Sequence, residues 1–447
     1  MAVEPRHNGY TAVAGLGVTG VACVRHLRAR GEAVVALDSR AEPPGAATVA
    51  AEHPEVELIT GGFDAERLAG AERVVVSPGL DLRRGPLSDL RAAGRPVVGE
   101  LSLFAEAAQG PVCAVTGSNG KSTVVTLLGE MAAAAGLDVG VGGNLGTPAL
   151  ALLEAAPADG YLLEVSSFQL ETCLGFRADY GAVLNVSPDH MDRYDSLGDY
   201  AATKDRILDG VTVAVVGHDD PWTAAMGHAA PRRLSFGVDA EADYRIADVQ
   251  GERWLLAADT PRLPVRALPV PGSAHQLNAL ASMALADALG IPGDAQAAVL
   301  RGFAGLPHRL ERIGTWDGVT WINDSKATNV GAAVAALSGM PGAVVLIAGG
   351  QGKGADFTAL AEACRERARA VVLIGEDAPA IEAALAGRVP SVCARDMTEA
   401  VEQARRRAQP GDTVLLAPAC ASFDQYAGFE ARGVAFREAV EREVAHG

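Results

Sequence analysis

The loop TGSNGKST at residues 116–123 constrains the fold more than any other feature of the chain. It stands between an apolar run, PVCAV, and a helix-like stretch, VVTLLGEMAAAAG. A Gly-rich loop in this setting typically cradles phosphates with its backbone amides, so we expect Lys121 to neutralise phosphate oxygens and the hydroxyl of Ser122 or Thr123 to ligate Mg²⁺. A strict pattern would have glycine at Val115, so the loop is a shortened variant. A Gly-rich turn with an exposed lysine is the alternative, which the agreement of strand, loop and helix disfavours.

Short apolar runs alternate with amphipathic stretches along the rest of the chain, as in parallel strands connected by helices. The predicted strands are YTAVAGLG from Tyr10, AVVALD to Asp38, PVCAV from Pro111, YLLEV near 161, GAVLNV near 181, VTVAVVG near 211, AVVLIAGG at 343, AVVLIG at 370 and DTVLLAP at 412. At roughly 150 residues per domain, the 447 residues predict three α/β domains in series. We expect a Rossmann-like domain over 1–100, a central P-loop ATPase-type parallel sheet domain over 101–305 and a second Rossmann-like domain over 306–447. The stretch 218–270, richer in Pro, Arg and short strand-like pieces, predicts an antiparallel addition.

The composition sets limits on partners and location. Lys and Arg number 38 against 55 Asp and Glu, and the net charge of 38 − 55 = −17 disfavours binding to a polyanionic nucleic acid. The six cysteines form no CxxC pair, so we expect reduced thiols and neither a zinc site nor a disulfide framework. No apolar stretch approaches the roughly 18 residues of a membrane span, and residues 1–10 lack an apolar signal segment. We therefore expect a cytoplasmic protein without membrane insertion, a monomer that acts on small molecules.

Residues 15–20, GLGVTG, match a G-x-G-x-x-G fingerprint between a predicted strand and a predicted helix, and Asp38 ends the next strand. Such a loop lets phosphates approach the backbone N–H groups at a helix N-terminus. The motif alone leaves three alternatives open, namely a dinucleotide site, a site for another nucleotide, and tight packing without a ligand. Arg40, two residues after Asp38, either serves a base or phosphate or is simply solvated.

A carboxylate and a histidine follow two strands of the predicted central domain. Glu164 ends YLLEV, so its carboxylate should lie at the carboxyl edge of the sheet beside the phosphate loop, where it suits a metal ion. His190 stands among three aspartates in SPDHMDRYDS, a predicted loop at the same edge. A surface role for Glu164 and a structural role for His190 are the alternatives. Lys204, in the helix-like DYAATKDRIL, would by itself be a solvated lysine.

Small polar residues also follow the strands of the third predicted domain. They form GLPHRLE at 305–311, INDSKATN at 322–329, GGQGKGADF at 349–357 and PACASFDQYAGFEARG at 418–433. Gly-rich turns account for part of this pattern. Arg309, Lys326 and Lys353 recur at such places in an acidic chain, which indicates an anion site shared with the central domain.

With TGSNGKST, EVSSFQLE, NVSPDHMDRY, ATKDRI, GLPHRLE, NDSKATN and PACASFDQY in this order, the chain resembles the Mur ligase family over nearly its whole length. Within the family, it is most similar to the members that add D-glutamate to UDP-N-acetylmuramoyl-L-alanine in peptidoglycan synthesis. GLGVTG, the SPG at 77–79, GGNLG at 142–146 and the tail PACASFDQYAGFE carry this closer similarity.

The resemblance implies three sets of site residues. Those for the UDP-linked acceptor are Val18, Thr19, Asp38, Ser39, Arg40 and Gly79 around the uridine diphosphate, and Asn144, Ser166, Gln169 and His190 around the muramoyl peptide end. Those for ATP are Gly117, Ser118, Asn119, Gly120, Lys121, Ser122 and Thr123 at the phosphates, and Asn278, Arg309 and Asp324 at adenosine or its phosphates. Those for D-glutamate are Thr328, Lys353, Ser422 and Phe429, with Lys326 close by.

The resemblance also implies two Mg²⁺ sites and a modified lysine. One ion would bind Ser122 and Glu164, and the other His190 and Lys204, whose amine CO₂ converts to a carbamate in this family. Lys121, Glu164, His190 and Lys204 are then the expected catalytic residues. The chain departs from the family pattern at Ala274 and His275, where His-Asn is common, and at Gln351, where an acid is frequent.

The implied chemistry is activation of the acceptor carboxylate by ATP to an acyl phosphate, which the amine of glutamate then attacks. Closure of the third domain over the centre would keep water away from the acyl phosphate. Four alternatives are a ligase resembling folylpolyglutamate synthetase, another step of the Mur ligase series, a nicotinamide dehydrogenase that uses GLGVTG, and a regulatory binder without activity. The first would need no UDP-binding domain, and the dehydrogenase would leave TGSNGKST without a role.

Overall fold

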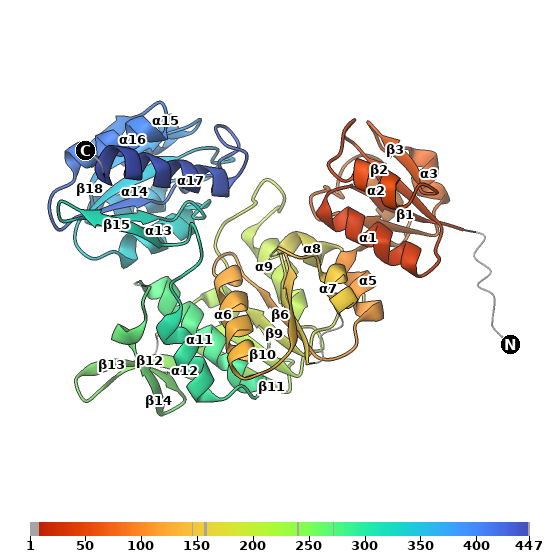
Figure 1. The fold of residues 1–447 in the computed structure, drawn as a ribbon, viewed down its shortest axis with the longest axis horizontal. Helices are drawn as coiled ribbons and strands as arrows, with labels where there is room; N and C mark the ends of the chain where they lie inside the picture. Colours follow the sequence, from red (N-terminus) through yellow and green to blue (C-terminus); the bar gives the residue numbers. More distant parts are fainter. Residues whose placement is uncertain (1–8, 145, 156–158, 239–240, 271, 446–447) are drawn as a thin grey trace.

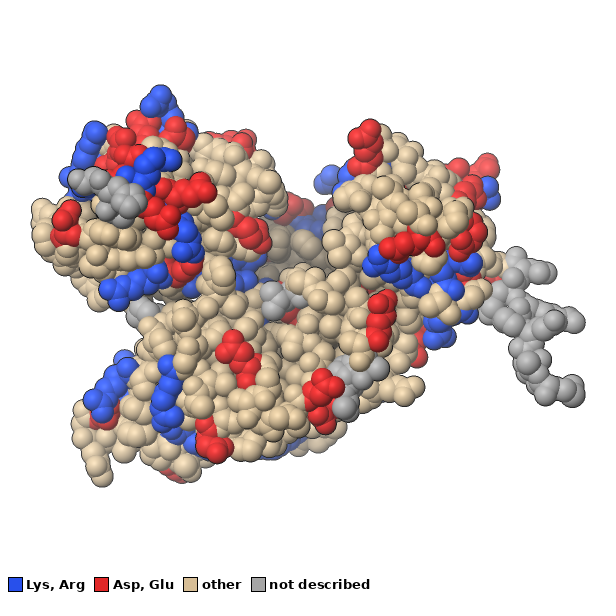
Figure 2. All heavy atoms as spheres, in the orientation of Figure 1, with Lys and Arg blue, Asp and Glu red and all other residues tan. Residues whose placement is uncertain are grey.

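The computed structural model describes residues 9–144, 146–155, 159–238, 241–270 and 272–445. It is a mixed α/β structure with three sheets, one in each of three lobes (Figure 1). The first and third lobes lie on either side of the central one, and the space-filling view shows a hollow between them (Figure 2). The predicted fold class, three α/β domains dominated by parallel sheets, is confirmed. We propose domain boundaries near residues 100 and 305, between the last element of one sheet region and the first of the next.

The first domain is a five-stranded parallel sheet in the order β3-β2-β1-β4-β5. Its strands are β1 (Thr11–Ala14), β2 (Val34–Asp38), β3 (Glu57–Thr60), β4 (Arg73–Val76) and β5 (Val97–Gly99), and its helices are α1 (Val18–Ala29), α2 (Ala46–Glu52), α3 (Ala65–Gly70) and α4 (Gly85–Ala92). The chain runs from β1 to β2 on one side, and β4 pairs with β1 on the other. The carboxyl end of β1 is therefore the switch point at which ligands bind in such sheets.

The central domain is a nine-stranded sheet in the order β14-β13-β12-β11-β10-β9-β6-β8-β7. Its strands are β6 (Val112–Thr116), β7 (Val139–Gly143), β8 (Gly160–Glu164), β9 (Tyr180–Val183), β10 (Val213–Gly217), β11 (Arg232–Gly237), β12 (Tyr244–Val249), β13 (Glu252–Ala257) and β14 (Thr260–Pro264). Its helices are α5 (Glu100–Ala107), α6 (Lys121–Ala134), α7 (Ala149–Ala155), α8 (Ser167–Glu171), α9 (Leu197–Asp205), η1 (Arg206–Leu208), α10 (Pro221–Ala224), η2 (Val265–Ala267), α11 (Ser273–Ala288) and α12 (Gly293–Gly302). Every residue of β6 and β8 is buried, which explains their continuous apolar runs.

The predicted antiparallel addition over 218–270 is only partly right. Strand β11 pairs in parallel with β10, and β12 pairs in parallel with β11, although through only two residue pairs. Antiparallel pairing is confined to β12, β13 and β14, which are joined by short turns. The segment with α10 between β10 and β11 is long enough to return the chain in parallel, whereas short turns join only antiparallel neighbours.

The third domain is a six-stranded sheet in the order β15-β16-β20-β17-β18-β19, parallel except for the hairpin of β15 and β16. Its strands are β15 (Glu311–Trp316), β16 (Val319–Asn323), β17 (Val344–Gly349), β18 (Ala368–Ile374), β19 (Ser391–Cys393) and β20 (Thr413–Leu416). Its helices are α13 (Val330–Gly339), α14 (Thr358–Arg367), α15 (Ala378–Leu385), α16 (Met397–Arg407), α17 (Phe429–Val440) and η3 (Glu441–Ala445). Separate apolar clusters pack on the two faces of this sheet, one with α13, α14 and α15 and the other with α16 and α17.

The cysteines and the apolar helices can be compared with what the sequence predicts. The six cysteines are all free thiols, and four of them are buried. Within the part of the chain that the structure describes, no helix is long and apolar enough to cross a membrane.

Candidate active site

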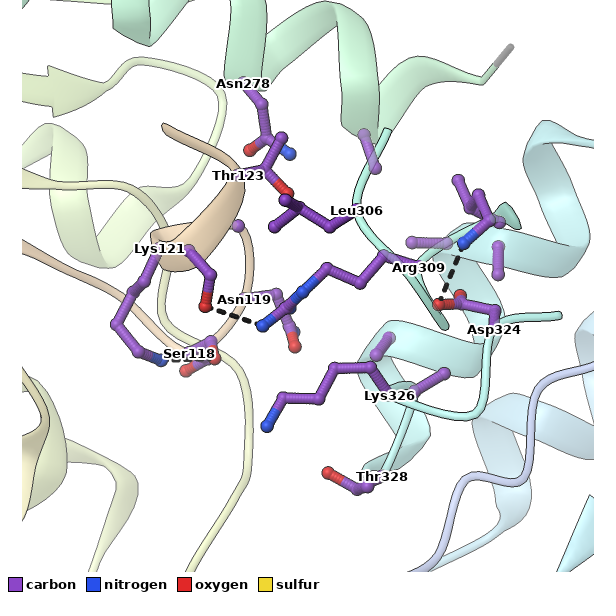
Figure 3. Close-up of a pocket in the computed structure, with 18 of the residues that line it drawn as sticks. Ser118, Asn119, Lys121, Thr123, Asn278, Leu306, Arg309, Asp324, Lys326 and Thr328 are labelled. Atoms are coloured by element: carbon purple, nitrogen blue, oxygen red, sulfur yellow. Dashed lines mark hydrogen bonds between the residues drawn. The ribbon is translucent and has the colours of Figure 1, made fainter. Parts of the chain in front are cut away.

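A cavity of about 390 Å³ lies between the central and third domains. Its walls come from the phosphate loop, the carboxyl ends of β8 and β9, the first turns of α11, the segment between α12 and β15, and the segment from β16 into α13. In Figure 3, Arg309 and Lys326 extend from the third-domain side toward Lys121 and Ser118 of the phosphate loop. Sequence segments almost 200 residues apart therefore face one another across one cavity.

The phosphate loop connects β6 to α6, so it stands at the carboxyl end of the strand that pairs with both β8 and β9. Gly117 has a φ of 153° and Gly120 a φ of 87°, and Gly120 is the N-cap of α6. A Cβ on Gly120 would lie 2.3 Å from Oδ1 of Asn278, so the amide of α11 packs directly against the loop. Asn185 also holds the loop. Ser118 N–H donates to the Asn185 carbonyl oxygen, and Asn119 N–H donates to Asn185 Oδ1 (2.9 Å each).

Two lysine amines meet at one carbonyl oxygen of this loop. Lys121 Nζ lies 2.8 Å from the carbonyl oxygen of Gly117, and Lys204 Nζ lies 3.0 Å from the same oxygen. Lys204 is buried, with 1% of its surface exposed, and its amine also lies 4.3 Å from the ring centre of Tyr200. Burial, then the charge of Lys121, lowers the pKa of Lys204 well below its usual value, and burial also lowers the pKa of Lys121. The solvated, exposed lysine of the sequence-only alternative is therefore wrong for Lys204.

Two cations of the third-domain side reach the cavity. Arg309 Nη2 donates to the hydroxyl of Ser122 at 2.6 Å, across the two domains. Lys326 Nζ lies 4.0 Å above the ring of Phe429, and burial followed by the charge of Arg309 lowers the pKa of this amine to about 8. Asp324 beside them is buried, which raises the pKa of its carboxyl to about 7. Together with Lys121, these two side chains bring positive charge to the cavity, which suits an anionic ligand.

Glu164 and His190 lie on the central-domain side of the cavity. Glu164 is buried, and its Oε1 accepts a hydrogen bond from Asn144 Nδ2 at 2.6 Å. His190 has a φ of 58°, its ring lies 4.6 Å from that of Phe168, and its Nε2 is 3.7 Å from Oδ2 of Asp189. Burial lowers the pKa of this imidazole, while Asp189 opposes the shift.

A second group of predicted residues lies at the switch point of the first domain. Asp38 is buried, and its carboxylate accepts from Leu16 N–H at 2.7 Å and from Arg40 at Nε (2.9 Å) and Nη2 (2.7 Å). The hydrogen bond from Arg40 lowers the pKa of Asp38 to about 2, with Leu16 N–H acting in the same direction. Both carboxylate oxygens already have protein donors, so Asp38 differs from the acid that binds ribose hydroxyls in dinucleotide sites. Val18, the first residue of α1, is 72% exposed.

The cavity brings together most of the residues expected in the second and third domains. Those that line it are Ser118, Asn119, Gly120, Lys121, Ser122, Thr123, Asn144, Glu164, Ser166, His190, Asn278, Arg309, Asp324, Lys326 and Thr328. Others lie outside its lining, namely Val18, Thr19, Asp38, Ser39, Arg40 and Gly79 in the first domain, and Gly117, Gln169, Lys204, Lys353, Ser422 and Phe429. Gln169 has a structural role, because it forms a capping box with Ser166 at the start of α8.

Lysine is rare in this chain. Only four of the 38 Lys and Arg residues are lysines: Lys121, Lys204, Lys326 and Lys353. All four belong to the residues expected at the site, as do two of the arginines, Arg40 and Arg309. A primary amine differs from guanidinium in its compact charge and in its ability to lose a proton when buried.

The residues around Glu164 fit a hard cation such as Mg²⁺. Oε2 of Glu164 is buried and finds no hydrogen-bond partner within the described ranges, and the hydroxyl of Ser122 lines the same cavity. Carboxylate and hydroxyl oxygens are ligands that Mg²⁺ accepts. The described residues contain no group of three or more His, Cys, Asp or Glu side chains placed to hold a metal. A site here would therefore need oxygens from a bound substrate or water, which is usual for Mg²⁺.

Sequence reasoning missed several residues that shape the site. The Phe168 ring contacts the His190 ring, and the guanidinium of Arg193 lies 4.5 Å from its centre. Arg432 is buried and donates to the carbonyls of Ser325 and Cys420, tying together two loops of the third domain. No local pattern marks these residues, because their partners are distant in sequence.

Three family models match the chain. The Mur ligase MurD-like N-terminal domain matches residues 10–99, the Mur ligase middle domain 115–286, and the Mur ligase glutamate ligase domain 308–420. Among the curated relatives, the UDP-N-acetylmuramoylalanine–D-glutamate ligase of Methylococcus capsulatus is 50% identical over 430 residues, which are 96% of this chain and 94% of that protein. The protein of the same name from Pseudomonas aeruginosa is 46% identical over 439 residues, 97% of this chain and 98% of that protein.

Solved structures share the fold at lower identity. The UDP-N-acetylmuramate-alanine ligase MurC of Thermotoga maritima has a TM-score of 0.61 at 18% identity, covering 97% of this chain and 100% of its own. A folylpolyglutamate synthase of Mycobacterium tuberculosis has a TM-score of 0.59 at 16% identity, covering 78% of this chain and 93% of its own. At these identities the likeness shows the fold alone.

Proposed function

Because the chain belongs to the Mur ligase family, we propose that it is an ATP-dependent ligase that adds D-glutamate to UDP-N-acetylmuramoyl-L-alanine. Its relatives at 46–50% identity over almost the whole chain carry the name of this reaction. These relatives confirm the resemblance of the chain to the Mur ligase family and to its D-glutamate-adding members. They favour this reaction over folylpolyglutamate synthesis, another Mur ligase step, a dehydrogenase and an inactive binder.

The observation that carries the proposal is the single cavity in which a phosphate loop faces the cations of a glutamate ligase domain. Lys121 lies on one side, and Arg309 and Lys326 on the other (Figure 3). Such an arrangement suits a reaction between two anions, the acceptor carboxylate and the γ-phosphate of ATP, whose repulsion must be neutralised.

The reaction proceeds in two steps. A carboxylate oxygen of the L-alanyl group attacks the γ-phosphorus, the bond to ADP breaks, and an acyl phosphate forms. The amine of D-glutamate then attacks the acyl carbon, loses a proton and expels phosphate, leaving an amide. Lys121 and Arg309 hold the phosphoryl oxygens, and His190, backed by Asp189, orients the reacting carboxyl or the incoming amine. No nucleophilic side chain is needed, because positioning and charge neutralisation supply the rate enhancement.

Mg²⁺ belongs to this proposal, since Glu164 and Ser122 would hold one ion and His190 with carbamylated Lys204 a second. When bound, the metal neutralises charge on the transferring phosphoryl group and polarises its oxygens. Lys204 as a free amine is no metal ligand. Its depressed pKa favours the neutral amine, the form that reacts with CO₂.

The UDP-linked acceptor would span the first domain and the cavity. Its uridine diphosphate would lie at the loop of Val18 and Thr19, with Asp38, Ser39, Arg40 and Gly79, and its peptide end at Asn144, Ser166 and His190. Arg83 of the first domain donates to the carbonyl of Asp192, two residues beyond His190, at 3.2 Å. The first domain therefore touches the loop that carries His190, which supports an acceptor that reaches from one to the other.

An ADP-release assay with different acceptors tests the proposed function. We expect release with UDP-N-acetylmuramoyl-L-alanine plus D-glutamate, and none with a reduced folate acceptor or with UDP-N-acetylmuramate. Release with the folate would favour the folylpolyglutamate alternative, and binding of NAD(H) would favour a dehydrogenase. Size-exclusion chromatography tests the expectation of a monomer, and cell fractionation that of a cytoplasmic location.

Arg40→Ala should raise the KM for the UDP-linked acceptor by about 10- to 100-fold and change kcat by less than about threefold. A contact remote from the reacting atoms is equal in the ground and transition states, so its loss affects binding alone. Steady-state kinetics at saturating ATP and D-glutamate measure both constants. Arg67→Ala is the matched control, because Arg67 is a similarly exposed, ion-paired arginine of the same domain away from the loop. A fall in kcat with an unchanged KM would contradict a uridine diphosphate site at Arg40.

A further inference from the structure

Helix α13 of the third domain lies against the central domain at both of its ends. Near its C-terminus, a Cβ built on Gly339 would lie 3.2 Å from the Cα of Gly272, just before α11. Near its N-terminus, a Cβ on Gly331 would lie 2.9 Å from Oγ of Ser187, in the segment after β9. At both positions a Cβ would be crowded by the central domain, so the backbone of α13 approaches that domain closely.

Asn329 makes the polar contacts at the N-terminal end of α13. It is buried and caps the helix, its Oδ1 accepting from Ala332 N–H at 2.8 Å. Its Nδ2 donates in the other direction, to Oδ2 of Asp189 at 3.0 Å and to Oδ1 of Asn119 at 3.3 Å. One amide thus fixes the start of a third-domain helix and also binds two elements of the central domain.

The two partners of Asn329 are adjacent to the chemistry. Asn119 belongs to the phosphate loop, and its own Nδ2 lies 3.4 Å from Oγ of Ser187. Asp189 holds the backbone of His190 through Oδ1, at 2.9 Å, and its Oδ2 lies 3.7 Å from Nε2 of the same residue. A displacement of Asn329 would therefore change the positions of both the phosphate loop and His190.

We propose that Asn329 is a positioning residue that docks the glutamate-binding domain on the phosphate loop and on Asp189, with Gly331 providing the close approach. The proposal rests on the proposed function. Docking at this point places Thr328, the preceding residue, and Lys326 at the cavity, with Lys326 extending toward the phosphate loop (Figure 3). It holds the third domain over the acyl phosphate, so that the amine of glutamate and not water attacks the acyl carbon. If water attacks instead, the carboxylate and phosphate are released and ATP is consumed without an amide.

Asn329→Ser and Asn329→Asp separate the interdomain hydrogen bonds of Nδ2 from the helix cap made by Oδ1. Serine and aspartate both cap helices, but neither side chain has an amide N–H to donate. We expect each to lower kcat/KM for D-glutamate at least about 10-fold, with less than about a threefold change in the acceptor KM. Asn329→Asp should be the more defective, since it sets a carboxylate beside Asp189. Both should release about two or more ADP per amide formed, whereas the wild type releases about one.

The matched control is Asp396→Ser, which makes the same kind of change at the N-cap of α16, where the carboxylate accepts from Glu399 N–H at 2.9 Å. It leaves the interface with the central domain untouched, so it should keep the wild-type ratio of ADP to amide. An equal defect in Asp396→Ser would show that loss of helix stability, and not of docking, is the cause.

Gly331→Ala tests the close approach independently. Alanine favours the helix, so folding of α13 should not suffer, yet its Cβ would meet Ser187 and push the domains apart. We expect the same uncoupling of ADP release from amide formation. Gly331→Ala/Ser187→Gly removes the obstructing side chain and should recover kcat/KM to within about fivefold of Ser187→Gly alone.

Two results would overturn the inference: Asn329→Ser with wild-type kcat/KM for D-glutamate and one ADP per amide, or a double variant no better than Gly331→Ala. Failure of the proposed function is distinguishable, because then the wild type itself forms no amide. Docking can still be measured in that case by small-angle X-ray scattering of the full chain. The radius of gyration should be larger for Asn329→Asp than for the wild type and Asp396→Ser, and equal values would contradict docking by Asn329.

Discussion

Lys121→Ala should lower kcat/KM for ligation by about 10³-fold, roughly 4 kcal/mol of transition-state stabilisation. Its amine stands at the phosphate loop, 2.8 Å from the carbonyl oxygen of Gly117 and directed into the loop that would surround the ATP phosphates. Loss of that charge leaves developing phosphoryl charge uncompensated, and the two anionic reactants then repel each other. Steady-state ADP release at saturating acceptor and D-glutamate measures the effect.

Binding of the UDP-linked acceptor to Lys121→Ala should stay within about threefold of the wild type, as measured by calorimetry without nucleotide. The uridine diphosphate is proposed to bind at Asp38 and Arg40, in another domain, where no atom of Lys121 takes part. Circular dichroism should show an unchanged fold. Equal losses of acceptor binding and of activity would contradict the separation of the two sites.

Lys204→Arg should retain less than about 1% of wild-type activity although it keeps the positive charge. A guanidinium cannot become a carbamate, and its pKa stays high even when it is buried. In this structure Lys204 is buried beside Lys121, and its lowered pKa favours the neutral amine that CO₂ attacks. An arginine with substantial activity would show that the residue acts as an ordinary cation.

The modification itself has a direct readout, because the chain has only four lysines. After equilibration with ¹³C-labelled bicarbonate, ¹³C NMR should show the same lysine carbamate resonance in the wild type and in Lys353→Arg. The resonance should be absent in Lys204→Arg. Lys204→Ala should regain part of its activity when a short-chain carboxylic acid is added, since the acid can occupy the place of the carbamate. No resonance in the wild type and no rescue would together contradict the carbamate.

The sequence was sufficient to predict the elements that bear the chemistry, because strand, loop and helix signals are local. TGSNGKST connects β6 to α6, and Glu164 ends β8, as expected. Parallel strands align their carboxyl ends, so residues that follow different strands meet at one edge. The same argument predicted that His190 would lie at this edge. Arg309 and Lys326 line the cavity, in agreement with the anion site predicted between the second and third domains.

Other features depend on contacts that no local pattern encodes. Periodicity made Lys204 a surface residue, whereas the packing of α9 buries it against Gly117 and Tyr200. Asn329 reads as a helix cap, which it is, but its second set of hydrogen bonds exists only when α13 lies on the central domain. The parallel pairing of β11 with β10 escaped prediction because the short strand-like runs carried no signal of direction.

Mass spectrometry of the product formed from UDP-N-acetylmuramoyl-L-alanine, ATP and each glutamate enantiomer tests the central claim most directly. With D-glutamate, we predict a UDP-linked product heavier by one glutamate residue, formed in amounts equal to the ADP released. With L-glutamate, we predict neither product nor ADP above background. Ligation of L-glutamate in preference to the D-enantiomer, or no UDP-linked product with either, would contradict the assignment of this chain as a D-glutamate-adding ligase.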